Sequence, residues 1–468
     1  MTGRETSAGT TRPGGQADAP PPVRADLIAG GGALALVALA AVVGAASYLA
    51  GRPVHASAAP FTAIWLPHAG PGTPLALAVA VLAGWHGFRL AETLSWRPLM
   101  LTGYGTALAW ILSLALVDGW QRGFAGRLTT GHEYLSEVGG VTDIPAMLDG
   151  FTGRILDFQP DSWTTHVAGH PPGALLLFVG LDRIGLGGGA WAALACAAVG
   201  ALLAVAVPVT IRALGGEDAA RAAVPFLVLF PGAVWIGASA DGLFAGVTAS
   251  GLALLAVALT RRRILVGAAA GALLVASLYL SYGLVLIIVP ALAILVLARR
   301  GGGLPWSTIS AALAAGGVVV AAFTLAGFCW LDGYHLVVDR YYQGIASDRP
   351  YAYWMWANLA LVVACAGPVA ATILRRVVLR AAPAVRLRGP SSLTAPAPVV
   401  LLPLAGLVAI LAADLSGLSK AEVERIWLPF AVWLMAGAAL LPPATRRGWL
   451  AVQAATALLI NHLLLTTW

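Results

Sequence analysis

The chain has 468 residues, of which 59% are hydrophobic and only 10% are charged. Its mean hydropathy of +0.83 and its repeated apolar runs argue against a soluble protein and indicate a multi-pass helical membrane protein. The net charge of +7 could suggest a nucleic-acid partner. The basic residues, however, lie mainly in short loops on one side of the predicted spans, so membrane topology explains the charge and we expect no nucleic-acid partner.

The first residues and the cysteines have simple interpretations. Residues 1–25 are rich in Gly, Pro, Thr and Ala, and they bury too little apolar surface to offset chain entropy, so they predict a disordered cytoplasmic tail. This tail is too long and too polar for the start of a cleaved signal, and the helix at 28–50 is expected to remain.

The spacing of Cys196, Cys329 and Cys365 fits neither a metal site nor a disulfide framework, so we expect small buried hydrophobic side chains.

Apolar segments over residues 26–468 predict a single all-α transmembrane domain, a bundle of about thirteen spans. The spans are expected at 28–50, 73–90, 99–117, 190–211, 222–240, 242–260, 264–280, 283–298, 306–329, 353–374, 398–414, 426–441 and 448–466. With a cytoplasmic N-terminus, most arginines fall inside and most acidic residues fall outside, as the positive-inside rule requires. The plasma membrane is the expected location, with the end near Trp468 outside.

One apolar segment does not fit as a span. The run HPPGALLLFVGL reaches Asp182 and Arg183 after about a dozen residues, which is too short to cross a bilayer. Counting it as a span would also move the later arginine clusters to the outside. We therefore interpret residues 171–183 as an interfacial or re-entrant helix, with its prolines at the helix N-terminus.

Polar residues gather in loops that this topology places outside. The outer loop 118–189 carries Asp118, Glu133, Asp143, Asp149, Asp157, Asp161, His132, His166 and His170. Residues 330–352 form a second outer loop, and residues 375–397 form a flexible cytoplasmic linker rich in Arg and Pro. Apolar residues at helical spacing over 135–155 predict an amphipathic helix on the membrane surface within the first loop.

Asp118 and Glu133 are the candidate catalytic carboxylates. Asp118 ends a predicted span, where it could accept a proton from a hydroxyl, could hold a metal beside a lipid phosphate, or could simply mark the water boundary. Glu133 stands at the entrance of the amphipathic helix, where it could be catalytic or could only complement the helix dipole. Its neighbours His132 and Tyr134 are candidates for substrate binding.

His166, His170 and Asp241 are further candidates. Two histidines four residues apart could share a helix face and bind zinc, but Gly169 and Pro171 interrupt the helix and no HExxH pattern is present. A hydrogen bond from one histidine to a phosphate or a sugar hydroxyl is the better functional interpretation, and a capping role is the alternative. Asp241 lies in an outer turn between two spans, where an ionisable residue suggests function.

Four basic residues are expected to bind phosphate. Arg340 and Arg349 lie among aromatic residues of the second outer loop, on the side where arginine is disfavoured, so an anionic partner is expected. Lys420 and Arg425, near the outer start of a later span, are reserves for the same role. The aromatic residues could form a sugar-binding or lipid-binding wall, or an ordinary interfacial belt.

Several of these elements together resemble the GT-C membrane glycosyltransferases, which include protein O-mannosyltransferases and aminoarabinose transferases. HPPGALLLF is similar to that superfamily's His/Lys-Pro-Pro-Leu element, and FPGAVWIGASADGLF is similar to its Pro…Ser-x-x-Asp hairpin. ERIWLPF resembles related actinobacterial integral membrane proteins. The resemblance is best over 99–260. The acidic loop follows the third span rather than the first, and Gly119 replaces the second acid of the usual pair.

The resemblance implies an inverting transfer of a sugar from a polyprenyl-phosphate donor to an acceptor at the outer face, with a carboxylate base. Membrane lipids and the lipid-linked donor are the implied partners. A transporter or flippase of lipid-linked substrates is the alternative function, although the ionisable residues cluster at the outer edge rather than at mid-span. The sugar, the acceptor, a divalent cation and the oligomeric state are not specified by the sequence.

Topology is directly testable. We predict that position 184, substituted with cysteine, is labelled by a membrane-impermeant thiol reagent from outside, because residues 171–183 do not cross. Labelling of position 184 only from the cytoplasmic side would refute the re-entrant helix.

Overall fold

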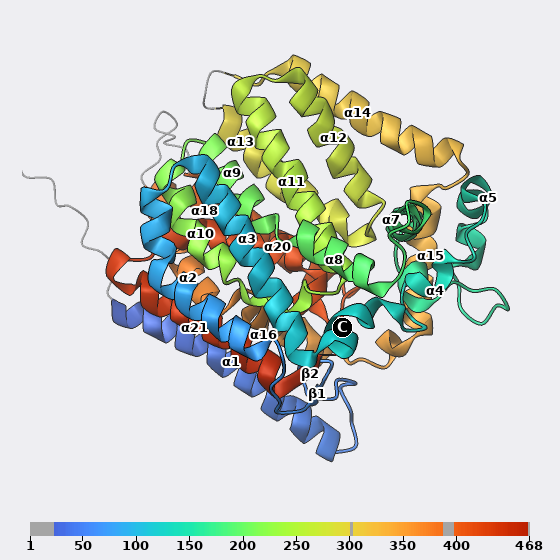
Figure 1. Ribbon diagram of the computed structural model, residues 1–468, viewed down its shortest axis with the longest axis horizontal. Helices are drawn as coiled ribbons and strands as arrows, with labels where there is room; N and C mark the ends of the chain where they lie inside the picture. The colour runs from blue at the N-terminus through green and yellow to red at the C-terminus, as the bar shows by residue number, and fades with distance from the viewer. Residues whose placement is uncertain (1–22, 300–302, 387–396, 467–468) are drawn as a thin grey trace, which may run out of the picture.

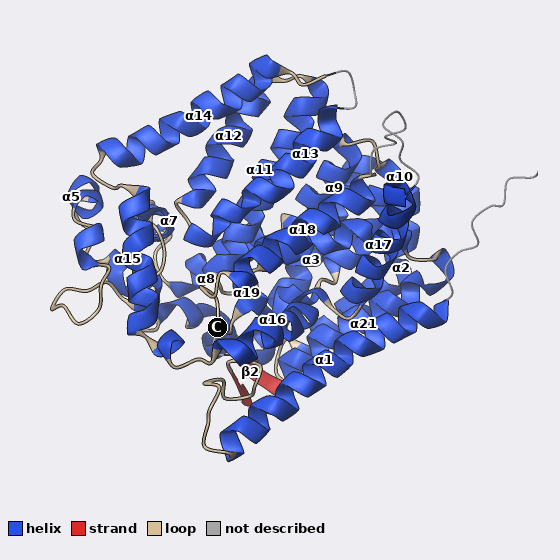
Figure 2. Cartoon of the chain, turned by 180° about the vertical axis from the view of Figure 1, so that it is seen from behind, coloured by secondary structure: helices blue, strands red, loops and turns tan. Residues whose placement is uncertain are grey.

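The computed structural model describes residues 23–299, 303–386 and 397–466, and these residues are almost entirely helical (Figures 1 and 2). The α-helices are α1 Val23–Leu49, α2 Thr73–Thr93, α3 Trp96–Ala115, α4 Leu135–Val138, α5 Ile144–Asp149, α6 Thr165–Ala168, α7 Pro172–Arg183, α8 Gly189–Gly200, α9 Leu203–Ala213, α10 Glu217–Val228, α11 Ala240–Arg261, α12 Ile264–Leu278, α13 Ile288–Ala298, α14 Trp306–Leu325, α15 Trp330–Gln343, α16 Tyr351–Ala366, α17 Val369–Arg386, α18 Pro398–Leu415, α19 Val423–Ile426, α20 Leu428–Ala431 and α21 Pro443–Leu463. Strands β1 Ala63–Trp65 and β2 Leu464–Thr466 pair antiparallel, with Ile64 opposite Leu465.

A multi-pass helical membrane protein is confirmed, but thirteen spans are not shown. By length and composition, seven helical segments of the described chain could cross a membrane, or eight if one bent pair counts as a span. The seven are Val23–Leu49, Thr73–Thr93, Trp96–Asp118, Gly189–Ala213, Ala240–Arg261, Trp306–Leu325 and Pro398–Leu415. Several other expected spans correspond to shorter apolar helices, namely Ile264–Leu278, Tyr282–Ala298 and Leu428–Leu440.

The span expected at 353–374 is bent. Helices α16 and α17 meet at an angle of 102°, because Gly367 takes a positive φ of 80° and Pro368 cannot continue the helix. The arginine-rich segment from residue 375 continues α17 to residue 386 instead of forming the expected linker. The rest of that linker, 387–396, and residues 1–22 of the expected tail lie outside the described residues.

The ion pairs of the described residues cluster at two ends of the molecule. At one end, which we call the site end, pairs join the segments 51–72, 118–189, 330–352 and 415–425 and the start of α11. At the other, the basic end, Asp26 of α1 pairs with Arg375 and Arg376 of α17, and Glu217 pairs with Arg212 and Arg221. Each of these pairs joins segments that the sequence places on the same side of the membrane. The contacts therefore support the predicted division into two sides.

The surface segment after Asp118 is broken rather than one continuous helix. α4 ends at Gly139 and Gly140, and α5 begins afresh with Asp143 as its N-cap, whose Oδ1 accepts a hydrogen bond from Ala146 N at 3.1 Å. The apolar face of this segment packs into the protein, through Met147, Leu148 and other residues, rather than lying free for the membrane surface. Two adjacent glycines weaken a helix that a 3.6-residue pattern alone would predict to be continuous.

Helix α7 is itself part of the site end, and both its first and its last residues lie beside other segments of that end. It follows His170 at its start, and near its end Arg183 Nη2 donates to Thr142 O at 3.0 Å. Twelve residues of helix span about 18 Å, which is less than the hydrocarbon core of a bilayer. These contacts support an interfacial or re-entrant position for 171–183, which the labelling experiment described above tests.

Close packing of α8 and α11 fixes the position of Asp241, which lies in the first turn of α11. A Cβ at Gly246 would lie 2.0 Å from the carbonyl oxygen of Val199 in α8, and a Cβ at Gly200 would lie 3.2 Å from Gly242 O. Small residues allow membrane helices to approach this closely.

We predict that Gly246→Ala lowers thermal stability in detergent, because the added methyl group must push two backbones apart, at a cost of about 1–3 kcal/mol. Gly105→Ala in α3 is the matched control, since its Cβ would meet no atom within 4 Å. Equal melting temperatures for the two variants would show that the α8–α11 contact is not tight.

Candidate active site

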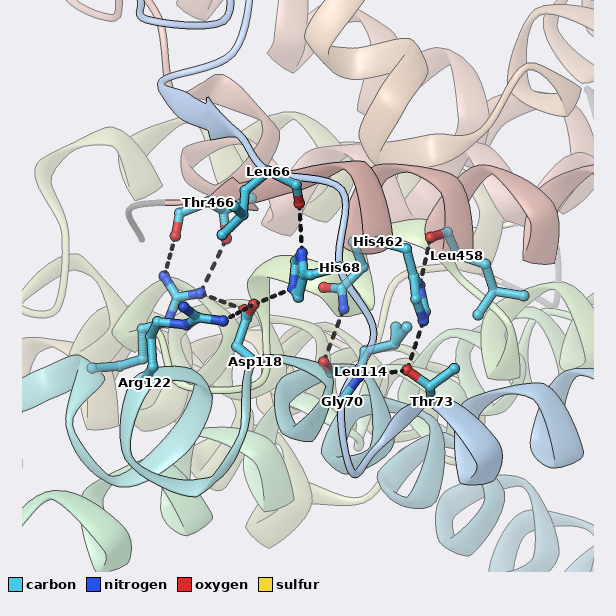
Figure 3. Close-up of polar contacts among 12 residues, drawn as sticks. Leu66, His68, Gly70, Thr73, Leu114, Asp118, Arg122, Leu458, His462 and Thr466 are labelled. Atoms are coloured by element: carbon cyan, nitrogen blue, oxygen red, sulfur yellow. Dashed lines mark hydrogen bonds and ion pairs between the residues drawn. The ribbon is translucent and has the colours of Figure 1, made fainter.

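Asp118 lies at the centre of a polar cluster at the site end (Figure 3). Its Oδ1 is 2.6 Å from His68 Nε2 and its Oδ2 is 3.2 Å from Arg127 Nη2. Arg122 Nη2 lies 3.9 Å from Oδ1. The Asp118 side chain is only 4% exposed, whereas that of Arg122 is 53% exposed. Both carboxylate oxygens of Asp118 are therefore occupied by nitrogen groups.

The contacts of His68 hold its ring against Asp118. Its Nδ1 lies 2.6 Å from the carbonyl oxygen of Leu66, which can only accept, so Nδ1 carries a hydrogen. Its Nε2 lies 2.6 Å from Asp118 Oδ1. Arg122 and Arg127 both lie near the single carboxylate of Asp118, so guanidinium groups outnumber carboxylates in this cluster.

Arg127 joins segments that are far apart in the sequence. Its Nη1 donates to Thr466 O at 2.6 Å and its Nη2 to Thr466 Oγ1 at 3.2 Å, in addition to the contact with Asp118. Thr466 is held in place because β2 pairs with β1. Burial lowers the pKa of Arg127, against the opposing effect of Asp118. A guanidinium group remains charged at any physiological pH.

Glu133 forms a second carboxylate–imidazole pair. Its Oε2 lies 2.8 Å from His166 Nδ1, and both side chains are about nine-tenths buried. The ring of Tyr134 packs against His166, His170 and Phe178, with centroids 5.2–5.9 Å apart. Burial also raises the pKa of Tyr134 well above its ordinary value. Tyr134 is therefore a neutral wall behind the Glu133–His166 pair.

His170 supports this wall and contacts Phe244. Burial lowers the pKa of His170 to about 4, so the imidazole is neutral at pH 7. Its Nδ1 donates to His166 O at 2.8 Å, and the neutral ring therefore has an acceptor at Nε2. An acceptor suits a sugar hydroxyl but not a phosphate oxygen.

Two adjacent cavities bring the polar groups together. The first is lined by Arg127, Glu133, Tyr134, His166, Ala238, Ser239, Ala240, Asp241 and Arg425. The second is lined by Ala115, Asp118, Gly123, Arg127, Val234, Trp235, Gly237, Ala238, Ser239 and Asn461. Both cavities are small, and Arg127, Ala238 and Ser239 border both. The two candidate carboxylates therefore lie on either side of Arg127.

A chain of alternating charges lies behind the first cavity. Asp241 Oδ2 is 2.5 Å from Arg425 Nη1, and Glu422 bridges Arg425 at 2.8 Å and Arg349 at 3.0 Å. Burial alone would raise the pKa of Glu422, but the two guanidinium groups outweigh burial and hold it below its usual range. Ala421 and Glu422 both have positive φ, a conformation that side chains disfavour and that here places Arg425 against Asp241.

Six of the predicted site residues line these cavities: Asp118, Glu133, Tyr134, His166, Asp241 and Arg425. The others lie elsewhere. Arg340 pairs with Asp157, and Lys420 Nζ donates to Ala346 O at 2.8 Å. Arg349 Nη1 donates to Lys420 O at 2.7 Å, and His132 is exposed.

The anionic partner that the sequence led us to expect for the outer arginines is an acidic side chain of the protein itself in each case, because Arg340 pairs with Asp157, Arg349 with Glu422 and Arg425 with Asp241. Phosphate binding by these arginines stays a prediction. Sequence reasoning also missed His68, Arg127 and Thr466. The GRLTTGHEY segment contains Arg127, but only the fold shows that it faces Glu133. In the part of the chain that is described, no group of three or more His, Cys, Asp or Glu side chains is placed to hold a metal ion.

Comparison with known proteins gives distant similarity only. No protein-family model and no curated protein matches the sequence. An Archaeoglobus fulgidus oligosaccharyltransferase tethered to an acceptor peptide matches with a TM-score of 0.41 and 13% identity, over 72% of this chain and 49% of that chain. The same enzyme in complex with Zn and sulfate matches with a TM-score of 0.37 and 15% identity, over 76% and 51%. The chain thus spans about half the length of these structures, and similarity this distant carries no argument about activity.

Glu424 gives the structure a predictable pH dependence. Its side chain is buried, its Oε2 has no hydrogen-bond partner among the described residues, and burial raises its pKa to about 8. Between about pH 5 and pH 8 the folded protein therefore keeps a proton at Glu424 that the unfolded chain loses, so the contribution of this group to stability falls as the pH rises. The lowered pKa of His170 acts in the opposite direction below about pH 6.5, so the fall in stability is expected above pH 7.

We predict that the melting temperature of the protein falls from pH 7 to pH 8, and that Glu424→Gln reduces this slope, because the amide cannot ionise. Identical slopes in the wild type and the variant would contradict the assignment.

Proposed function

We propose that the protein is a GT-C-type glycosyltransferase that moves a sugar from a polyprenyl-phosphate donor to an acceptor hydroxyl at the site end. One observation carries this proposal. Two adjoining cavities gather three carboxylates and two guanidinium groups, from Asp118, Glu133, Asp241, Arg127 and Arg425, in a chain with 10% charged residues. Such a concentration at the ends of apolar helices suits a substrate with a lipid tail and a charged head.

The donor phosphate is assigned to the Asp118 side of the site. Arg127 and the exposed Arg122 give that cluster its excess positive charge, and a guanidinium group matches phosphate geometry. Asp118 then acts as a positioning residue, because its oxygens hold His68 and Arg127. Arg425 lines the first cavity but is balanced by Asp241 and Glu422.

The catalytic base is assigned to Glu133, which reverses the order expected from the sequence. Glu133 Oε2 is bound to His166, while Oε1 has no hydrogen-bond partner within the described chain. A general base needs a lone pair within reach of the acceptor hydroxyl, and Asp118 has both oxygens occupied.

The reaction then follows simply. The acceptor oxygen attacks the anomeric carbon from the face opposite the phosphate, and its proton passes to Glu133. The bond between the anomeric carbon and the phosphate oxygen breaks, and the polyprenyl phosphate leaves with its new negative charge beside Arg127. Stabilisation of charge that develops in the transition state is commonly a large part of catalysis.

We predict that Glu133→Gln lowers turnover by about 10²–10⁴-fold with little effect on donor affinity, because the amide keeps the shape but cannot accept the proton. Asp118→Asn should instead weaken donor binding, since it disturbs Arg127. The assay measures release of polyprenyl phosphate from a lipid-linked sugar by purified protein.

Glu137→Gln is the matched control. Glu137 lies four residues from Glu133, pairs with Arg154 at 3.6 Å and lines neither cavity. Full turnover in both Glu133→Gln and Asp118→Asn would reject these residues as the site. Transport of the lipid-linked sugar without any release of polyprenyl phosphate would favour a flippase.

A further inference from the structure

A separate crevice of about 450 Å³ lies at the basic end of the molecule. It is lined by Trp96, Val209, Arg212, Ala213, Gly215, Glu217, Val257, Thr260 and Arg261. These residues come from the start of α3, the end of α9 and the end of α11, which belong to three of the candidate spans, and from the start of α10. The crevice is therefore formed where the ends of three candidate spans meet.

The crevice has a cationic rim and apolar walls. Arg212 stacks over the ring of Trp96, with its Cζ 4.4 Å from the ring centroid, and its Nε donates to Glu217 at 3.0 Å. Glu217 is shared with Arg221, whose Nη2 lies 2.9 Å away. The single carboxylate of Glu217 therefore balances only one of the two arginines, Arg212 and Arg221. This group of three side chains has a net charge of one positive unit.

Arg261 also lines the crevice and adds a further positive charge. Its side chain is exposed, and within residues 23–299, 303–386 and 397–466 it has no hydrogen bond or ion pair. Val209 and Val257 form half-buried walls on helices that continue into the apolar part of the molecule. Trp96 is of the residue type that prefers the membrane–water interface.

We propose that this crevice binds the headgroup of an anionic phospholipid from the leaflet at the basic end. The phosphate contacts Arg212 and Arg261, and the first methylenes of the acyl chains lie against Val209 and Val257. Two guanidinium groups suit a phosphate diester, and the apolar walls select a lipid over a free phosphate. This site is independent of the proposed glycosyltransferase site.

The test is the binding of phosphatidylglycerol to the purified full chain in detergent, measured by native mass spectrometry. Phosphatidylcholine tests the need for net negative charge, and glycerol phosphate tests the need for acyl chains. We expect Arg261→Gln to weaken phosphatidylglycerol binding by about tenfold or more, because one charge-assisted contact is lost.

Arg263→Gln is the matched control. It removes the same charge two residues away, from a position that does not line the crevice. Binding within about twofold of the wild type in this variant would support the proposal, as would much weaker binding of phosphatidylcholine and glycerol phosphate. Equal losses in both variants would reduce the effect to general surface charge and overturn the proposal. Equal affinity for phosphatidylcholine, or for glycerol phosphate, would overturn it too.

Discussion

The structure depends on charge compensation at the ends of apolar helices. A carboxylate or a guanidinium group removed from water is costly unless an opposite charge and hydrogen bonds accompany it. Asp118, with His68 and Arg127, meets this condition, and so does Asp241 with Arg425. At the opposite end Asp26, which is fully buried, pairs with Arg375 and Arg376. Few polar side chains are available, so their pairings determine which loops meet.

These pairings also build the site. Arg127 donates to the Thr466 backbone, and the strand of Thr466 pairs with β1 just before His68. The segment between α1 and α2 therefore meets the last described strand beside Asp118 (Figure 3). The turn before α19 brings Arg425 to Asp241, while the contact of Gly246 with Val199 fixes α11. The cavities thus lie where five separate parts of the chain converge, namely 115–134, 166, 234–241, 425 and 461. The charged groups that line the cavities are therefore held in position by contacts within the protein itself, which is the preorganisation that the proposed function requires.

The sequence was informative where a single segment carries the signal. Hydropathy alone predicted a helical membrane protein. The short apolar run at 171–183 is a helix of twelve residues, Pro172–Arg183, and its failure to cross the membrane stays a prediction. The sequence also selected Asp118, Glu133, His166, Asp241 and Arg425, because ionisable residues are rare in so apolar a chain. Partners could not be predicted, since pairs such as His68 with Asp118 lie 50 residues apart and no local pattern connects them. For the same reason arginines that looked uncompensated proved to be paired. The break between α16 and α17 is a different case, because a local signal for it exists in the Gly-Pro pair at residues 367–368. The length of the apolar run around this pair nevertheless favoured one continuous span over 353–374.

The central claim is that a lipid-linked phosphate binds between Asp118 and Glu133, against Arg127. A cryo-EM structure of the wild-type protein with a non-hydrolysable polyprenyl-phosphate sugar analogue tests it most directly. The account predicts phosphate density within hydrogen-bonding distance of the Arg127 guanidinium, with the sugar towards Glu133. Phosphate density at Arg340 or Arg349 instead, with both cavities closed, would contradict it.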